Sequence, residues 1–148
     1  MAFLRNTWYV ALWSQDLAAG QMVPRKFLNE PIVLFRDEQG AAHAIADACA
    51  HRFAPLSMGK IVKGGNVRCP YHALEFDGTG KCVHNPHGNG RIANTLKVRS
   101  YPVHEKHSMV WIWMGDKQAD PALVPDMHWM TDPALSASHG MLEFRCNY

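Results

Sequence analysis

The hydrophobic pattern of the chain consists of many short apolar runs separated by turn residues, and helical periods are few. Several of these runs are rich in β-branched and aromatic residues, and glycine-containing turns such as 37–40 and 77–80 divide them. The segments that we expect to be strands are 32–36, 41–47, 60–62, 66–68, 74–76, 98–103 and 109–114. Strands this short, joined by tight turns, predict an all-β fold of the antiparallel sandwich or barrel type.

Two features indicate how the chain is divided. Segment 109–114 is apolar on both faces of a strand, a pattern that predicts a central and buried position. Segment 116–125 contains two prolines and has the composition of a linker, and 141–148 resumes a strand-like pattern. We therefore expect one domain over 1–115, followed over 116–148 by a linker and the first strand of a C-terminal domain that is missing from this chain.

Composition and charge narrow the class of protein. Of the 148 residues, 47% are apolar and 19% are charged, values that indicate a packed globular core. The formal net charge of +2 and the scattered basic residues do not favour nucleic acid as a partner. No run approaches the roughly 20 apolar residues that span a bilayer, and no signal-peptide pattern is present, so we expect no membrane association and a cytoplasmic location. In such a reducing compartment, cysteines bind metals more often than they form disulfides.

One pattern among the cysteines and histidines has the spacing of a metal site. The motifs C-A-H at 49–51 and C-P-Y-H at 69–72 each offer one thiolate and one imidazole, and 17 residues separate them. Such a Cys2His2 set can hold either zinc or a [2Fe–2S] cluster. Zinc sites usually pair like ligands, whereas in a Rieske centre two cysteines bind one iron and two histidines bind the other. Because each loop mixes the two types, the spacing favours a [2Fe–2S] cluster held by Cys49, His51, Cys69 and His72.

Together with the segments around it, this motif resembles the Rieske non-haem iron oxygenases, in particular oxygenase components of the vanillate and dicamba O-demethylase type. The resemblance runs through segments 5–11, 51–57, 69–77, 82–88, 110–113, 120–123 and 146–148. It implies a Rieske domain, which is an antiparallel β sandwich or barrel with a small cluster-binding subdomain. Two positions depart from the family pattern: Ala50 replaces a frequent proline, and Ala73 replaces the glycine that usually follows the second histidine.

The resemblance also implies an enzyme that uses O2 and NADH-derived electrons to oxidise an aromatic small molecule, by O-demethylation of an aryl methyl ether such as vanillate. A reductase or ferredoxin would supply the electron, which would leave through His72 for a mononuclear Fe(II) in the next subunit of a homotrimer. The family holds that iron with an Asp-x-x-His-x-x-x-x-His motif, which does not occur in this sequence. No catalytic residue is therefore expected within the chain, and the Fe(II) would belong to the missing C-terminal part.

Several other residues have less specific roles. We expect Cys82 and Cys146 to be buried free thiols, and His84 and His87 to lie in a structural loop over the cluster. The tryptophans of segment 109–114 are expected in the core. Three basic residues between the ligand loops form either a docking surface for an acidic reductase or a solvated hairpin face, namely Lys60, Lys63 and Arg68.

Two alternative functions remain open at this point. A free-standing Rieske ferredoxin would carry electrons only, and its reading frame would stop soon after the strand at 109–114. A zinc-stabilised binding module would use the same four side chains without redox chemistry. The colour of the protein distinguishes the zinc module from the other two, because zinc is colourless and a Rieske cluster is red-brown.

Overall fold

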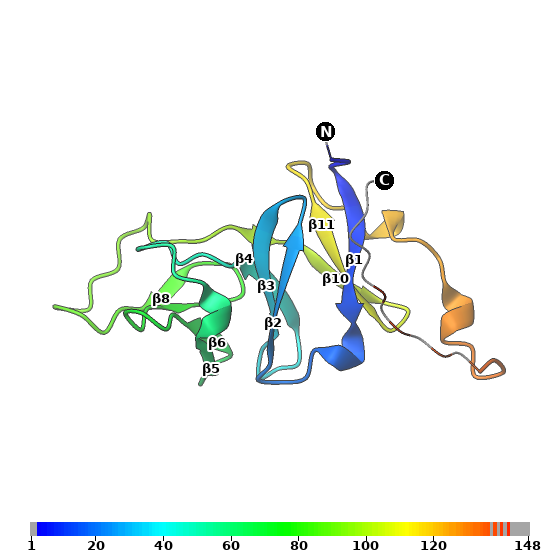
Figure 1. Cartoon of the computed structure of the whole chain (residues 1–148), viewed down its shortest axis with the longest axis horizontal. Coiled ribbons are helices and arrows are strands. Elements are labelled where there is room, and N and C mark those ends of the chain that lie inside the picture. Colours follow the sequence, from blue (N-terminus) through cyan, green and yellow to red (C-terminus); the bar gives the residue numbers. More distant parts are fainter. Residues whose placement is uncertain (1–2, 137, 139, 141, 143–148) are drawn as a thin grey trace.

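A computed structural model describes residues 3–136 together with 138, 140 and 142, and the regular secondary structure of this part of the chain is almost entirely β (Figure 1). Its strands form three antiparallel sheets, A, B and C. Sheet A contains, in spatial order, β1 (Thr7–Trp13), β11 (Met109–Met114) and β10 (Val103–Lys106). Sheet B contains β2 (Met22–Phe27), β3 (Glu30–Arg36), β4 (Ala42–Ala46) and β9 (Ser100–Tyr101). Sheet C contains β5 (Lys60–Val62), β6 (Asn66–Arg68), β7 (Glu75–Phe76) and β8 (Cys82–His84).

The helices of the described residues are all short 3-10 turns. They are η1 (Ser14–Asp16), η2 (Leu56–Met58), η3 (Pro121–Leu123) and η4 (His128–Met130). Within these residues, none of the helices has the length and apolar character that crossing a bilayer requires.

The prediction of an antiparallel all-β fold is confirmed, and the strands predicted at 60–62, 66–68 and 109–114 coincide with β5, β6 and β11. The prediction of a single strand at 98–103 is wrong. It is divided into β9 and β10 at Pro102, which has no backbone N–H to contribute to a ladder. The hydrophobic pattern also missed β1, β2 and β8. In β2 a proline, Pro24, interrupts the pattern, and this strand lies at the edge of sheet B, where proline is tolerated.

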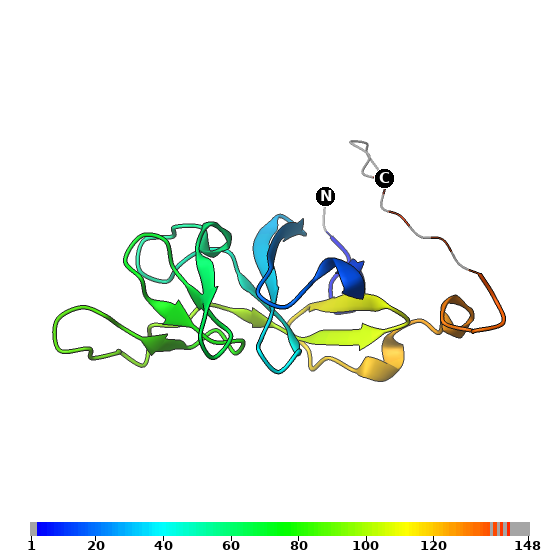
Figure 2. The same cartoon turned by 90° about the horizontal axis from the view of Figure 1, so that it is seen from below.

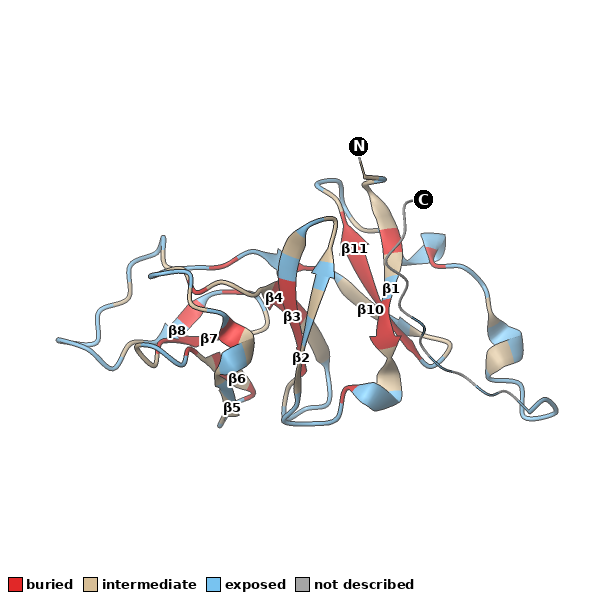
Figure 3. Cartoon of the chain, in the orientation of Figure 1, coloured by how far each residue is buried: buried red, intermediate tan, exposed pale blue. Residues whose placement is uncertain are grey.

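Strand β3 connects the two main cores because its two faces are both covered. Ile32 and Leu34 enter the core between sheets A and B, whereas Val33 and Phe35 enter the core between sheets B and C. Successive side chains of a strand point to opposite faces of the sheet, so a strand covered on both faces buries all of them. All four side chains are indeed fully buried (Figure 3). Sheet B is therefore the middle layer. Sheet A packs on one of its faces, and the small subdomain, which is sheet C with its loops over residues 47–98, packs on the other.

Strand β11 is the central strand of sheet A, and all six of its side chains are buried, as the sequence predicts. Its outer face is covered by the segment that follows it. The indole Nε1 of Trp8 on β1 donates to the Asp120 carbonyl at 2.8 Å, and the indole Nε1 of Trp113 donates to the Lys117 carbonyl at 3.0 Å. Val124 is also buried in this cluster of tryptophans. The segment with the composition of a linker is thus packed against sheet A.

The small subdomain and segment 116–136 lie at opposite ends of the molecule, with sheets A and B between them (Figures 1 and 2). Loop 85–97 projects from the subdomain end in both views. Of the strand predicted at 141–148, only Leu142 is among the described residues, so this prediction falls outside the part of the chain that the structure describes.

Candidate metal centre

The first candidate loop starts at the buried Cys49 and is closed by backbone hydrogen bonds. The Cys49 N–H donates to the Ala54 carbonyl at 2.9 Å, and the Phe53 N–H donates to the Cys49 carbonyl at 2.8 Å. Phe53 has a φ of +57°, which lets the chain turn sharply after His51. The base of the loop is fixed by Asp47, whose carboxylate accepts from both the N–H (2.7 Å) and the hydroxyl (2.6 Å) of Ser57. The loop is therefore held at both its tip and its base.

The second loop repeats this construction. The Cys69 N–H donates to the Leu74 carbonyl at 2.8 Å, the Ala73 N–H donates to the Cys69 carbonyl at 3.1 Å, and Ala73 has a φ of +56°. Its base is held by an ion pair, in which Nε and Nη2 of Arg68 both contact Oε1 of Glu75, at 3.0 and 2.7 Å. Glu75 is the buried charged residue of this region, and Arg68 neutralises it. Both loops thus span five residues from the cysteine to a residue with positive φ.

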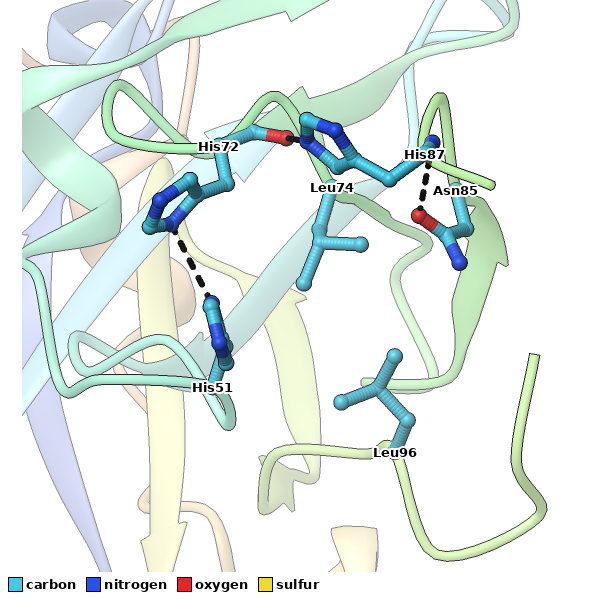
Figure 4. Close-up of a pocket in the computed structure, with 6 residues that line it drawn as sticks. All are labelled: His51, His72, Leu74, Asn85, His87 and Leu96. Carbon is cyan, nitrogen blue, oxygen red and sulfur yellow. Dashed lines mark hydrogen bonds between the residues drawn. The ribbon is translucent and has the colours of Figure 1, made fainter. Parts of the chain in front are cut away.

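The two loops bring the four predicted ligands together as a thiol pair and an imidazole pair. Cys49 and Cys69 are only 2% and 3% exposed and belong to the same core cluster. Burial, together with the smaller effect of the adjacent Cys69 thiol, raises the pKa of the Cys49 thiol to about 11. Nδ1 of His51 and Nδ1 of His72 lie 3.1 Å apart, with the two rings facing each other across the loops (Figure 4). Like donors therefore meet in pairs, although each loop contributes one of each type.

This donor set fits a two-iron cluster. Two nitrogens that each bind iron at roughly 2.1 Å lie about 3 Å apart when the N–Fe–N angle is near a right angle or slightly larger. Two thiols buried side by side become stable thiolates only where a cation compensates their charge. Within the described residues, no three His, Cys, Asp or Glu side chains are grouped to hold a single ion. A [2Fe–2S] cluster needs only two protein donors per iron, because bridging sulfides complete the coordination.

A hollow of about 310 Å³ lies beside the two imidazoles (Figure 4). Apolar and polar side chains line it together, namely His51, His72, Leu74, Asn85, His87 and Leu96. Burial lowers the pKa of His72, and the nearby His51, His87 and Arg52 lower it further. These effects favour the neutral form of the His72 imidazole, which is the form that binds a metal.

Other predicted residues have more definite roles than the sequence indicated. The expected free, buried thiol at Cys82 is confirmed, whereas Cys146 lies outside the described residues. Arg68 is held in its ion pair with Glu75, so its guanidinium is not a free docking charge, while Lys60 and Lys63 are exposed. The sequence reasoning missed the two carboxylates that fix the loops. Their positions, two residues before the first cysteine and three after the second histidine, are the only signal for them in the sequence.

An antiparallel sandwich that carries two matched Cys/His loops on a small third sheet defines an iron–sulfur electron-transfer domain. The model of the Rieske [2Fe-2S] domain family matches residues 7–102. The chain therefore belongs to the Rieske [2Fe–2S] domain family, whose members bind a [2Fe–2S] cluster.

Known relatives extend this match along the whole chain. The oxygenase component of dicamba O-demethylase from Stenotrophomonas maltophilia is 48% identical over 100% of this chain and 43% of its own length. The vanillate O-demethylase oxygenase subunit of a Pseudomonas species is 37% identical over 99% of this chain and 40% of its own. The crystal structure of apo dicamba monooxygenase matches with a TM-score of 0.86 and 49% identity over 90% of this chain and 41% of that chain. The resemblance to O-demethylase oxygenase components is confirmed, and the chain spans less than half the length of these relatives.

Proposed function

We propose that Cys49 and Cys69 bind one iron of a [2Fe–2S] cluster and that His51 and His72 bind the other. The observation that carries this proposal is the pairing of like donors from two loops of matching construction, with the two Nδ1 atoms 3.1 Å apart and both thiols buried in one core. When bound, such a cluster accepts and releases one electron, at a potential of about −150 to +300 mV for this ligand type.

The residues around the cluster would set its environment. With Nδ1 of His51 and of His72 turned inward, the opposite ring nitrogens are free to face a partner protein, and we assign His72 as the electron exit. Leu74 and Leu96 line the hollow beside the rings and reduce access of water to them. Phe53 and Tyr71, which are 79% and 60% exposed, flank the two histidines and are the apolar contacts that a docking partner would cover.

For the whole protein we propose an oxygenase of the aromatic O-demethylase type. Electrons from NADH would reach this domain through a reductase or ferredoxin and pass to a mononuclear Fe(II) outside residues 1–148. The enzyme would hydroxylate the methyl carbon of an aryl methyl ether, and the hemiacetal formed would break down to a phenol and formaldehyde. The support is the similarity to dicamba and vanillate O-demethylase components over 100% and 99% of the chain.

The assembly that we propose is a homotrimer in which the electron crosses between subunits. The candidate cluster loops lie at one end of the molecule, and segment 116–136 lies at the other end (Figure 1). A catalytic domain built onto this end would lie far from its own cluster, and such a separation would favour delivery of the electron to a neighbouring subunit. We further propose that the Rieske domain covers 1–115 and that 116–148 contains the linker and the first strand of a catalytic domain, with 116–130 packed back on sheet A.

The cluster is tested by anaerobic reconstitution of the 148-residue chain with iron and sulfide. We expect two irons and two acid-labile sulfides per chain, a red-brown colour, and a Rieske-type EPR signal after reduction. Cys49→Ser and His72→Ala should lose the cluster. The matched control is Cys82→Ser, which removes a buried thiol outside the two loops and should leave the cluster intact. A colourless protein that binds zinc and contains no labile sulfide would contradict the proposal.

The length of the reading frame distinguishes the proposed oxygenase from a free-standing ferredoxin. The reading frame should continue beyond codon 148 and encode the Asp-x-x-His-x-x-x-x-His motif. The full-length protein should release formaldehyde from a methoxylated aromatic acid when NADH, O2 and a reductase are supplied. A stop codon close to codon 148 would favour the ferredoxin instead.

A further inference from the structure

His87 makes a direct contact with the second candidate ligand loop, although it lies outside the Cys/His motifs. Its Nε2 donates to the backbone carbonyl of His72 at 2.8 Å. The two imidazole rings meet edge to face, with centroids 5.9 Å apart and planes inclined at 79°. Figure 4 shows the His87 ring reaching from its own loop to this carbonyl, across one side of the hollow.

The loop that carries His87 is itself organised by hydrogen bonds. The Asn85 side-chain oxygen accepts from the His87 N–H at 3.1 Å, and the Asn85 amide group donates to the Arg91 carbonyl at 2.8 Å. The Gly90 N–H also donates to the His87 carbonyl at 3.0 Å. The backbone of His87 is thus held from two sides, and its ring has a fixed position from which to bond His72.

The carbonyl that His87 contacts belongs to a peptide whose orientation matters for the candidate ligand. This peptide joins His72 to Ala73, which has a φ of +56°, a conformation that alanine adopts less readily than glycine. A donor on the carbonyl fixes the plane of the peptide. The His72 imidazole is attached to the same residue, so fixing the peptide also restricts the direction in which Nδ1 points.

We infer that His87 is a positioning residue for His72. Its hydrogen bond holds the peptide after His72, so that Nδ1 of His72 stays directed at the iron that the two histidines would bind. Both the neutral Nε2–H tautomer and the imidazolium donate from this nitrogen, so the role does not depend on the charge of His87. This inference rests on the proposed cluster ligands and adds a residue that supports one of them.

The test compares two side chains of similar length at position 87. His87→Gln keeps an N–H donor, whereas His87→Met has none. Each variant is reconstituted and reduced, and the 14N couplings of the two ligand histidines are measured by pulsed EPR. The control is His84→Ala, which removes an exposed histidine of β8 from the same part of the chain.

We expect the Met variant to show a changed 14N coupling for one histidine. It should also lose the cluster to a chelator about fivefold faster, because the free energy of one ordinary hydrogen bond corresponds to a factor of about five in rate. The Gln variant and the His84→Ala variant should match the wild type. A Met variant that holds no cluster while the Gln variant holds one also supports the inference. Met and Gln variants with the same couplings and the same rate of loss would overturn it. Absence of a cluster from the wild type would instead reject the proposed function.

Discussion

Ala73→Gly is expected to stabilise the protein, because Ala73 has a φ of +56° in the second loop. The left-handed conformation costs a residue with a Cβ about 1–2 kcal/mol. Glycine gives up about 0.4–1 kcal/mol of this advantage because the unfolded chain gains freedom. The net gain in the free energy of unfolding is therefore about 0.5–1 kcal/mol, which for a chain of this length raises Tm by about 1–4 °C.

The measurement is thermal unfolding of the reconstituted protein under anaerobic conditions, followed by tryptophan fluorescence. Ala50→Gly is the matched control. Ala50 occupies the other loop without a positive φ, so glycine should lower the stability there by about 0.4–1 kcal/mol. Opposite signs at the two positions would confirm that the backbone conformation of Ala73 is the cause. An unchanged or lowered Tm for Ala73→Gly would refute the reasoning.

Three further predictions concern other parts of the fold. Glu75→Gln should lower the free energy of unfolding by about 1–2 kcal/mol, since it weakens two charge-assisted bonds to Arg68; an unchanged urea midpoint would contradict this. Burial, and then the hydrogen bond to Glu30, raise the pKa of Tyr101 above its usual 10.0. The stabilisation that the protonated Tyr101 hydroxyl provides is therefore complete below pH 10 and is lost as the pH rises further. In urea titrations, the difference in free energy of unfolding between wild type and Tyr101→Phe should narrow above pH 10. A constant difference would contradict this prediction. Ile112→Ala, at a site that is 0% exposed, should cost about 2–5 kcal/mol by the same assay, and a loss below 1 kcal/mol would show that the core can collapse around it.

The local sequence predicts some parts of this fold well. The run at 109–114 contains only apolar residues, which fit a strand covered on both faces, and the two short runs around Lys63-Gly64-Gly65 form the expected hairpin. The spacing of the two Cys/His motifs pointed to two candidate loops, and in the structure each motif spans one tight turn. These signals are local, so none of them depends on how distant parts of the chain meet.

The parts that the sequence did not reveal depend on contacts between distant residues. β1 pairs with β11 across the whole domain, and nothing within β1 alone indicates its partner. The hydrogen bond from His87 to His72 and the cover of Trp8 by segment 116–130 depend on the same kind of tertiary contact. The strand at 98–103 was divided by Pro102, a local signal that the apolar pattern outweighed.

The pairing of β1 with β11 also has a consequence for the order of events during synthesis. The strand at Thr7–Trp13 emerges from the ribosome early, yet its hydrogen-bonding partner, Met109–Met114, is translated only after both candidate ligand loops. Pairings between strands that are distant in sequence form slowly. Sheet A is therefore completed only after the two candidate ligand loops have left the ribosome. The amino-terminal strand therefore stays without its partner until most of the domain has been translated, and the closing of sheet A is a late step in folding.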